Sequence, residues 1–360
     1  MKKILMTGGG SAGHVTPNIA LIKGLKEHGF EIHYAGLKDG IEQRLITAVP
    51  GVTFHEIESG KLRRYISLKN LASPFKVIKG VQQAKKLVKE LQPDVVFSKG
   101  GFVSVPVVMA AAKRCPVVCH ESDYTPGLAN KIAAHYVDTV CVTFEDTIKH
   151  ADKKLAAKMV HTGTPIRPEL YEGVREKGLE AMGFDGKKPV LMVMGGSLGA
   201  AAVNDGVREA LPELIKTFDI VHLCGKGKVA PEFTRPGYAQ FEYVREELPD
   251  MMAATDVVIS RAGANAVFEF MALGIPALLI PLPLEASRGD QILNAQYVAA
   301  RGYALVLDQK DITAERLVSS VMELWANRAQ MHAKMKADPL LDGTEEVLDE
   351  ILKAAEGKKN

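Results

Sequence analysis

The sequence predicts an α/β protein with two doubly wound parallel-sheet domains, and three observations support this prediction. Strand-like and helix-like segments alternate along all 360 residues, as they do in parallel sheets covered by helices. The strand, glycine turn and helix order of the opening recurs at Pro189–Leu211. Gly163–Pro168, rich in proline, lies between the two halves and is typical of a linker. A chain of this length also has enough residues for two separate cores.

Short apolar runs bounded by glycine, proline or polar residues mark the expected strands. In the first half these runs are Ile4–Met6, Ile32–Ala35, Thr53–Ile57, Val95–Phe97, Val117–Cys119, Thr139–Val142 and Met159–His161. In the second half they are Pro189–Met194, Ile220–Leu223, Gln240–Tyr243, Val257–Ile259, Ala277–Ile280 and Ala304–Val306.

The composition is that of an ordinary soluble globular protein, with 47% hydrophobic residues, 24% charged residues and a net charge of +2. This weak charge, without a recognised module, disfavours nucleic acid as a partner. We expect no secretory signal, and the longest apolar run, Met271–Leu284, contains three prolines and is not expected to span a bilayer. The four cysteines form no C-x-x-C pair, so we expect reduced, buried thiols.

The opening of the chain predicts a strand at Lys3–Met6, a glycine turn at Thr7–Gly10 and a helix from Pro17. Such a turn offers main-chain N–H groups at the positive end of the helix dipole, where phosphate or developing negative charge binds. His14 directly follows the last glycine and is the titratable side chain of this loop. Because an imidazole exchanges protons near neutral pH, His14 is a candidate for proton transfer.

Two other interpretations of this loop stay open on its residues alone. Gly8–Gly13 fits G-x-G-x-x-G, the dinucleotide-binding fingerprint, which needs an acidic residue at the end of the second strand. The second strand, Glu31–Ala35, is followed by Gly36–Lys38, so the first acidic residue, Asp39, lies beyond the end of the strand. Alternatively, the glycines serve only the packing of a tight turn.

One segment is strongly basic: Lys61–Lys89 holds nine Lys or Arg residues and no Asp or Glu. At helical spacing one apolar stripe is expected to face the sheet, namely Val77, Val81, Ala84, Val88 and Leu91. Phe75 and Ile78 fall on the other side. Apolar groups ringed by cations favour insertion into an anionic membrane surface. The alternative is a covered hydrophobic patch beside a solvated basic face.

Polar residues in the second half are candidates for a nucleotide-sugar site. Ser197, within Gly195–Gly199, precedes a helix and suits a diphosphate. This stretch also fits the nucleophile elbow G-x-S-x-G, but no convincing Asp and His follow. Glu269 can bind ribose hydroxyls or can be an ordinary solvated glutamate. Asp290 and Gln291 suit sugar hydroxyls or a helix cap.

His120–Asp123 places four polar residues after the strand Val117–Cys119. A metal site from His120 and Glu121 is disfavoured, because neighbouring side chains on an extended chain point apart.

Taken in order, these motifs resemble the MurG family of N-acetylglucosaminyltransferases over nearly the whole chain. The motifs that carry the resemblance are Gly8–His14 with Pro17, Lys99–Ser104, His120–Ser122, Thr164–Arg167, Gly195–Ala200, Arg261–Ala264 with Glu269, and Asp290–Gln291 with Asn294–Ala295. Each motif alone is weak, and the ordered set is specific. The family transfers N-acetylglucosamine from UDP-N-acetylglucosamine to undecaprenyl-pyrophosphoryl-N-acetylmuramyl-pentapeptide (lipid I), which gives lipid II for peptidoglycan.

The resemblance implies a GT-B fold, in which two Rossmann-like domains face a central cleft. Residues 1–164 would form the acceptor and membrane-docking domain, completed by a C-terminal helix at 342–356, and residues 165–341 the UDP-sugar domain. It also implies a peripheral enzyme at the cytoplasmic face of the cell membrane, which uses UDP-N-acetylglucosamine and lipid I as substrates and needs no cofactor or metal. Anionic inner-leaflet lipids and other cell-wall synthesis proteins are the further expected partners, without nucleic acid.

Family positions assign candidate roles to residues of this chain. The donor-binding positions are Ser11, Ala12, Gly13, Asp123, Arg167, Ser197, Val244, Gly263, Ala264, Glu269, Asp290 and Gln291. Among these, Ser197 would hold the diphosphate, Glu269 the ribose, the main chain near Val244 the uracil, and Gln291 with Asp290 the sugar hydroxyls. Asp123 stands where many members carry asparagine. The membrane-docking positions are Arg64, Tyr65, Ile66, Leu68, Leu71, Phe75, Ile78 and Lys79.

The mechanism that follows is an inverting displacement, with His14 as the base for the acceptor hydroxyl. Amide groups around Ser197 and the helix start at Gly263 would stabilise the leaving UDP without a metal. This mechanism expects His14 and Ser197 on opposite walls of one cleft. A UDP-N-acetylglucosamine 2-epimerase, a diacylglycerol glycosyltransferase and a non-catalytic nucleotide-sugar-binding protein remain the alternatives.

Overall fold

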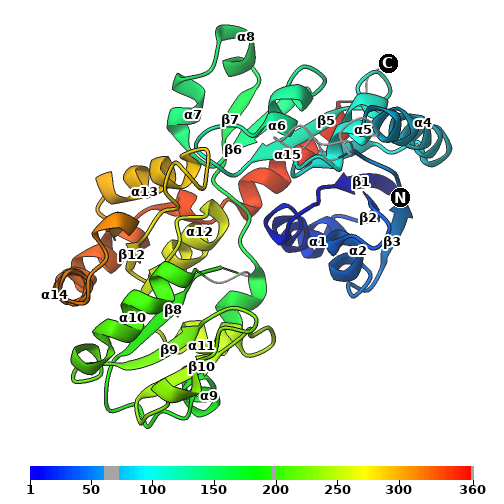
Figure 1. Ribbon diagram of the computed structural model, residues 1–360. Coiled ribbons are helices and arrows are strands. Elements are labelled where there is room, and N and C mark those ends of the chain that lie inside the picture. Colours follow the sequence, from blue (N-terminus) through cyan, green and yellow to red (C-terminus); the bar gives the residue numbers. More distant parts are fainter. Residues whose placement is uncertain (61–72, 197–199, 358–360) are drawn as a thin grey trace. The chain divides into compact units, whose positions relative to one another are not determined.

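The computed structural model describes residues 1–60, 73–196 and 200–357. The chain divides into two compact units: Met1–Arg167 with Asp342–Asn360, and Pro168–Leu341 (Figure 1). Each unit has a parallel sheet flanked by helices. The α/β class and the parallel sheets predicted from the alternating pattern are therefore confirmed.

The first unit is built on a parallel sheet that has seven strands within the described residues, in the order β3-β2-β1-β4-β5-β6-β7. Its strands are β1 Lys2–Thr7, β2 Phe30–Gly36, β3 Val52–Glu56, β4 Val95–Ser98, β5 Val117–Glu121, β6 Thr139–Val142 and β7 Met159–His161. Its helices are α1 Thr16–Glu27, α2 Ile41–Ile46, α4 Ser73–Leu91, α5 Ser104–Ala111, α6 Leu128–Ala133, α7 Glu145–Lys149, α8 Lys153–Ala156 and α15 Thr344–Glu356, with a 3-10 turn, η1, at Ala12–His14.

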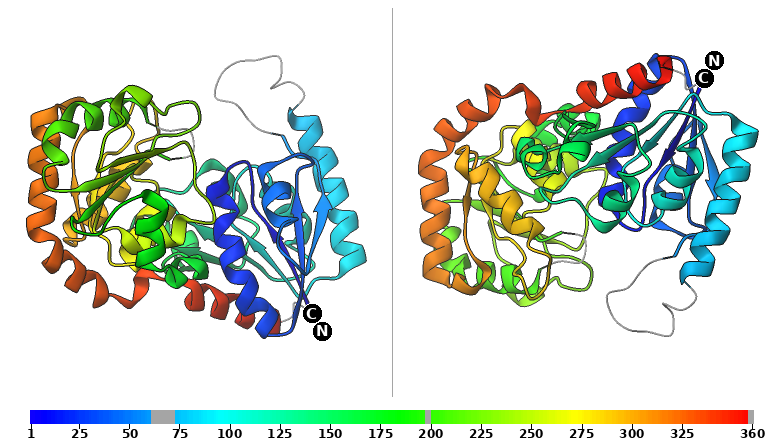
Figure 2. Two further views of the ribbon diagram at one scale, coloured as in Figure 1. Left: turned by 90° about the horizontal axis from the view of Figure 1, so that it is seen from below. Right: turned by 90° about the horizontal axis from the view of Figure 1, so that it is seen from above.

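Helices cover both faces of this sheet (Figure 2). On one face α1 and α15 pack with Ile4 and Met6 of β1. On the other face α4 and α5 pack with Leu5 of β1. Alternate residues of β1 thus enter two different cores, because successive side chains of a strand point to opposite faces.

The C-terminal helix α15 is part of the first unit's core although it follows the second unit in sequence. Its apolar residues Val347, Leu348 and Ile351 share one face at helical spacing and are buried. Leu348 lies over Gly24 of α1, where a Cβ would come within 2.7 Å of the leucine Cδ2. A glycine at position 24 therefore makes room for α15.

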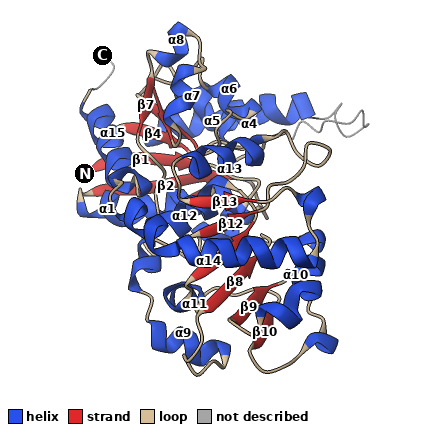
Figure 3. Cartoon of the chain, turned by 90° about the vertical axis from the view of Figure 1, so that its left-hand side faces the viewer, coloured by secondary structure: helices blue, strands red, loops and turns tan. Residues whose placement is uncertain are grey.

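The second unit repeats the arrangement with a parallel sheet of six strands in the described part of the chain, in the order β10-β9-β8-β11-β12-β13. The strands are β8 Val190–Met194, β9 Asp219–Leu223, β10 Tyr238–Phe241, β11 Val257–Ser260, β12 Ala277–Leu279 and β13 Ala304–Val306. The helices are α9 Arg175–Met182, α10 Ala201–Leu214, α11 Leu248–Ala254, α12 Ala264–Ala272, α13 Asp290–Ala300 and α14 Ala314–Lys336, with short 3-10 turns η2 Pro168–Glu172, η3 Pro231–Phe233, η4 Gln309–Asp311 and η5 Pro339–Leu341. The long α14 runs across the strands (Figure 3).

Every expected strand is present, and one was misplaced: β10 spans Tyr238–Phe241 rather than Gln240–Tyr243. Phe241 is the last residue in register with β9. Tyr243 has left the sheet, is 60% exposed and carries the Arg245 guanidinium over its ring at 5.4 Å. Tyr243 therefore belongs to the loop after β10 and not to the strand.

All four cysteines are buried free thiols, as expected. Among the helices of the described ranges, none combines the length and the apolarity needed to cross a bilayer.

Candidate functional site

The glycine motifs of each unit follow the two strands where the strand order reverses. In the first unit β1 is followed by Gly8–His14 and its neighbour β4 by Lys99–Ser104. In the second unit the neighbours β8 and β11 are followed by Gly195–Ala200 and Arg261–Ala264. Doubly wound sheets bind ligands at this switch point, beyond the carboxyl ends of the strands. Each unit therefore has one candidate binding edge.

Buried side chains fix the main chain of the Gly8–His14 loop. The Tyr34 hydroxyl donates to the Gly8 carbonyl at 2.7 Å. The Asn18 amide donates to the Tyr34 hydroxyl at 2.9 Å and to the His14 carbonyl at 3.2 Å. Tyr34 is fully buried, which raises the pKa of its phenol well above the usual range. Tyr34 therefore stays a neutral hydrogen-bond donor.

His14 ends the η1 turn that the loop forms, and it is half-buried. Its Nδ1 lies 2.8 Å from the Ser11 hydroxyl oxygen. When Nδ1–H donates to Ser11, the ring presents the lone pair of Nε2, which is the form a general base needs. Gly101, at φ +78, lets the second loop approach, since a Cβ there would lie 3.3 Å from His14 Nδ1. The structure thus gives His14 a defined hydrogen-bond partner within its own loop.

The first residue of the Lys99–Ser104 motif, to which the sequence analysis gave no role of its own, is a buried lysine at the start of the second loop. Lys99 is 1% exposed, and its amine contacts His120 Nδ1 at 2.6 Å and the Ser122 hydroxyl. His120 Nε2 lies 2.8 Å from the Gly163 carbonyl. Because a carbonyl only accepts, Nε2 carries the imidazole proton and Nδ1 accepts from Lys99. This chain of bonds ties the β4 end to the segment that leaves the first unit.

Burial shifts the pKa values of this cluster. Burial lowers the pKa of Lys99 to about 7, against the opposing effect of the carboxylates of Glu121 and Asp123. Burial, and then the Lys99 charge, hold the pKa of His120 well below its usual range. His120 is therefore a neutral hydrogen-bonding group at physiological pH rather than an acid.

Glu121 binds main-chain and amide groups. Its carboxylate accepts from Asp123 N at 3.0 Å, Gly127 N at 2.9 Å and Asn130 Nδ2 at 2.9 Å. His120 and Glu121 thus have separate hydrogen-bond partners. Within the described ranges no group of three or more His, Cys, Asp or Glu side chains could hold a metal ion.

The donor candidates of the second unit gather around the start of α12. Gly263 is the N-cap of this helix, and a Cβ there would meet no atom of the described residues within 4 Å. Glu269 is only 9% exposed, so the alternative that it is an ordinary solvated glutamate is wrong. Ala264 is buried in the first turn. Ser197, the diphosphate candidate, lies outside the described residues.

The start of α13 is fastened to neighbouring loops. Asn294 donates to the Ala262 carbonyl at 3.1 Å, and Gln291 Oε1 accepts from Leu282 N at 3.1 Å. Because the oxygen of Gln291 accepts this bond, its side-chain N–H groups are the ones that could donate elsewhere. Asp290 forms an ion pair with Arg288 at 3.4 Å.

Arg261 is a second residue that the sequence analysis did not single out for this role. It donates to the carbonyls of Ile280 and Pro281 at 3.0 and 3.2 Å and to Gln309 at 2.6 Å. It thus braces three loops at the binding edge. The motif around Arg261 was noted in the sequence, but bonds to distant carbonyls leave no sequence signal.

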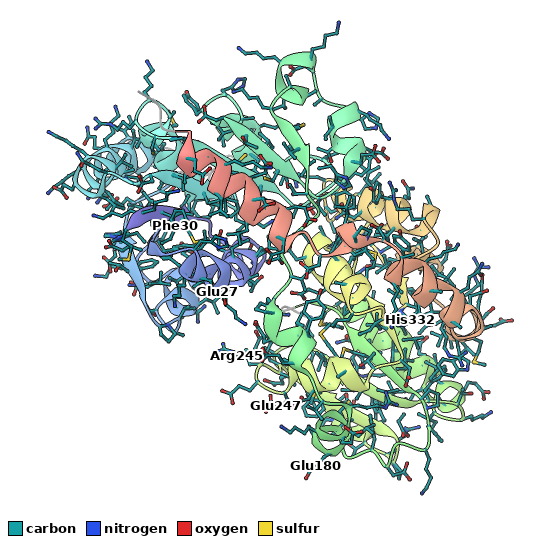
Figure 4. All side chains as sticks on the ribbon, turned by 180° about the vertical axis from the view of Figure 1, so that it is seen from behind. Glu27, Phe30, Glu180, Arg245, Glu247 and His332 are labelled. Atoms are coloured by element: carbon teal, nitrogen blue, oxygen red, sulfur yellow. The ribbon has the colours of Figure 1, made fainter. Side chains whose placement is uncertain are left out.

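Three further predicted donor residues belong to segments of the chain other than α12 and α13. Val244 is buried, between the exposed Tyr243 and Arg245; Figure 4 shows Arg245 and Glu247 at the surface of this segment. Asp123 and Arg167 belong to the first unit and are both half-buried.

Only part of the predicted membrane-docking segment is described. Arg64, Tyr65, Ile66, Leu68 and Leu71 lie outside the described residues, and Phe75 is placed on α4 by its main chain alone.

The described part of α4 fits the predicted faces. Ile78 is 57% exposed, and Lys79 pairs with Glu58, so one expected cation has an intramolecular partner. The predicted stripe facing the sheet is confirmed for Ala84, Val88 and Leu91, which are buried, whereas Val77 and Val81 are half-buried.

Comparisons with known proteins agree with this architecture. A family model described as Glycosyltransferase family 28 N-terminal domain matches residues 4–142, and one described as Glycosyltransferase family 28 C-terminal domain matches residues 190–351. Together with the two switch-point edges, these matches define a family 28 glycosyltransferase with the two-domain GT-B architecture.

Individual relatives show to which family of these glycosyltransferases the chain belongs. The chain is 51% identical to a UDP-N-acetylglucosamine–N-acetylmuramyl-(pentapeptide) pyrophosphoryl-undecaprenol N-acetylglucosamine transferase of Clostridium tetani, over 98% of both chains. It is 54% identical to transferase 2 of that name from Bacillus cereus, over 93% of this chain and 95% of the relative. The crystal structure of Acinetobacter baumannii MurG has a TM-score of 0.74 and 27% identity, and the match covers 98% of this chain and 100% of that one. The chain therefore belongs to the MurG family.

Proposed function

We propose that this protein transfers N-acetylglucosamine from UDP-N-acetylglucosamine to the 4-hydroxyl of N-acetylmuramic acid in lipid I, which forms lipid II for peptidoglycan. One observation carries the proposal: over nearly its full length the chain is 51% and 52% identical in sequence to transferases whose names state this donor and acceptor. An inverting glycosyltransferase needs a binding site for the nucleotide sugar and a base that deprotonates the acceptor. The two units offer candidates for both.

His14 is the proposed base. The acceptor hydroxyl is a poor nucleophile until its proton is removed during bond formation, which suits a group that titrates near neutral pH. The Ser11 hydroxyl, 2.8 Å from Nδ1, supports the tautomer with a lone pair at Nε2. The displacement occurs directly at the anomeric carbon, so its stereochemistry inverts.

The second unit is the proposed donor side. The buried Glu269 on α12 is the candidate for the ribose hydroxyls, and the donors of Gln291 for the sugar hydroxyls. The open N-terminus of α12 at Gly263 stabilises the charge that leaves with UDP. Because the main-chain N–H groups at this helix start are dipoles already aligned toward the leaving charge, the proposed mechanism needs no divalent metal.

The acceptor is membrane-linked, and we propose that the protein reaches it from the cytoplasmic face as a peripheral protein. The exposed Ile78 on α4 supports this view, as do the many cations and absent carboxylates of Lys61–Lys89. Apolar insertion and attraction to anionic headgroups act together in such binding.

The test is an assay with labelled UDP-N-acetylglucosamine, with and without a short-chain lipid I analogue. Formation of a lipid-linked disaccharide only with the analogue supports the proposal. Conversion of the nucleotide sugar without acceptor would indicate an epimerase, transfer to diacylglycerol would indicate another acceptor class, and binding of UDP without turnover would indicate a non-catalytic protein. Parallel reactions with EDTA test the metal-independent mechanism, which loss of activity would overturn.

A further inference from the structure

Glu42, in the first turn of α2, is a carboxylate with 0% exposure. Its Oε2 accepts from Gly10 N at 3.2 Å, and its Oε1 accepts from Leu37 N at 3.0 Å. Glu42 therefore joins the loop after β1 to the loop after β2. Glu42 thus occupies a main-chain N–H of the glycine loop itself.

Three glycines from three segments enclose this carboxylate. A Cβ on Gly9 would lie 2.6 Å from Glu42 Cδ, one on Gly40 would lie 2.6 Å from Oε1, and one on Gly36 would lie 2.7 Å from Cγ. None of these three glycines has a positive φ, so their backbone conformation does not demand glycine. The space they leave is filled by the side chain of Glu42.

Burying a carboxylate is costly unless it is hydrogen-bonded, and an apolar side chain would fill the same space without that cost. The benefit must therefore come from what the carboxylate holds. It holds Gly10, the residue before Ser11, and Ser11 is the partner of His14.

We propose that Glu42 is a positioning residue for His14. By fixing the peptide N–H of Gly10 it sets the path of the loop so that the Ser11 hydroxyl meets His14 Nδ1. This inference rests on the proposed role of His14 as the base. It differs from that role because Glu42 acts through the loop and touches no substrate.

The test compares E42Q with a matched control, D94N. Glutamine keeps the shape of Glu42 but replaces one acceptor oxygen with a donor, so Gly10 N and Leu37 N cannot both keep their partners. We expect kcat to fall about tenfold or more, because small misplacements of a catalytic group are costly, and KM for UDP-N-acetylglucosamine to stay within about twofold. Asp94 also accepts a main-chain N–H in the first unit, from Lys3 at 2.7 Å, but at the amino ends of the strands. D94N should keep kcat.

Further measurements separate positioning from folding. The thermal midpoint of both variants shows whether stability changes, and the NMR signals of the Gly10 amide and the His14 ring should move in E42Q but not in D94N. G9A, whose Cβ displaces the carboxylate, should reproduce the kcat loss. Wild-type kcat in a folded E42Q or G9A protein would overturn the proposal. An H14A variant measured alongside tells the two ideas apart: if H14A turns over normally, the base assignment fails, and if H14A is impaired while E42Q is normal, only the role of Glu42 fails.

Discussion

The hydroxyl oxygen of Ser11 lies 2.8 Å from Nδ1 of His14, within a single 3-10 turn. A hydroxyl can donate to or accept from an imidazole nitrogen, and the direction decides which ring nitrogen carries the lone pair. For His14 to act as a base through Nε2, its Nδ1–H must donate to Ser11. If His14 is the base proposed above, Ser11 is the hydrogen-bond acceptor that orients its ring and favours this tautomer.

Replacing Ser11 with alanine should therefore lower turnover. Without the acceptor, the Nε2–H tautomer becomes more populated, and we expect kcat to fall about tenfold with little change in KM for the donor. Kinetics together with the ¹⁵N shifts of the His14 ring measure both effects. S11T, which keeps a hydroxyl, is the control and should stay near wild type. An S11A enzyme with normal kcat and an unchanged tautomer contradicts the argument.

Replacing His14 with alanine should have the larger effect. Loss of a general base lowers turnover by roughly a hundredfold or more, whereas UDP affinity, measured by calorimetry, should be kept because the residues proposed for the ribose and the diphosphate belong to the second unit. H28A is the matched control, since His28 is an exposed histidine at the end of α1. Turnover of H14A equal to that of H28A would remove the base assignment.

The buried Lys99 makes stability depend on pH in the alkaline range. Burial lowers the pKa of Lys99 from its ordinary 10.5 to about 7 in the folded protein, so the unfolded chain binds more protons between these two pH values. The free energy of unfolding therefore rises with pH from about 7 to 10, by on the order of a few kcal/mol. K99M removes this titration, and its stability relative to wild type should fall as the pH is raised. Denaturation across this range checks the slope, and a pH-independent difference would contradict the buried cation.

The exposed apolar residue of α4 provides a test of membrane docking. I78E places a carboxylate at a position that is 57% exposed, within a segment that carries no acidic residue in the sequence. We expect weaker co-flotation with anionic vesicles, because the change removes apolar contact and adds repulsion. M322E, on α14 of the second unit and 40% exposed, is the control. If both variants lost vesicle binding equally, or if neither lost it, a docking role for Ile78 would be refuted.

Much of this architecture could be predicted because its signals are local. Apolar runs ended by glycine gave the strands, and the loops after β1, β4, β8 and β11 followed from the same pattern. The supports of the site could not be predicted in this way. Glu42 meets Gly10 across 32 residues, and Lys99 meets His120 across 21. Such pairs depend on which strands become neighbours, so the sequence pattern marks the loop but not the side chains that hold it.

The return of α15 to the first unit predicts that its core residues stabilise the sheet that carries His14. Leu348 is 2% exposed and packs over Gly24. L348A removes buried methyl groups and leaves a cavity, so it should lower the free energy of unfolding of the first unit by about 2–5 kcal/mol. K353A is the control on the same helix: the Lys353 side chain is 68% exposed and pairs with Glu350, and the loss of such a solvent-screened ion pair changes stability little. The β1 and β4 amides should lose protection against hydrogen exchange in L348A but not in K353A. Equal protection in both variants would mean that α15 does not stabilise this sheet.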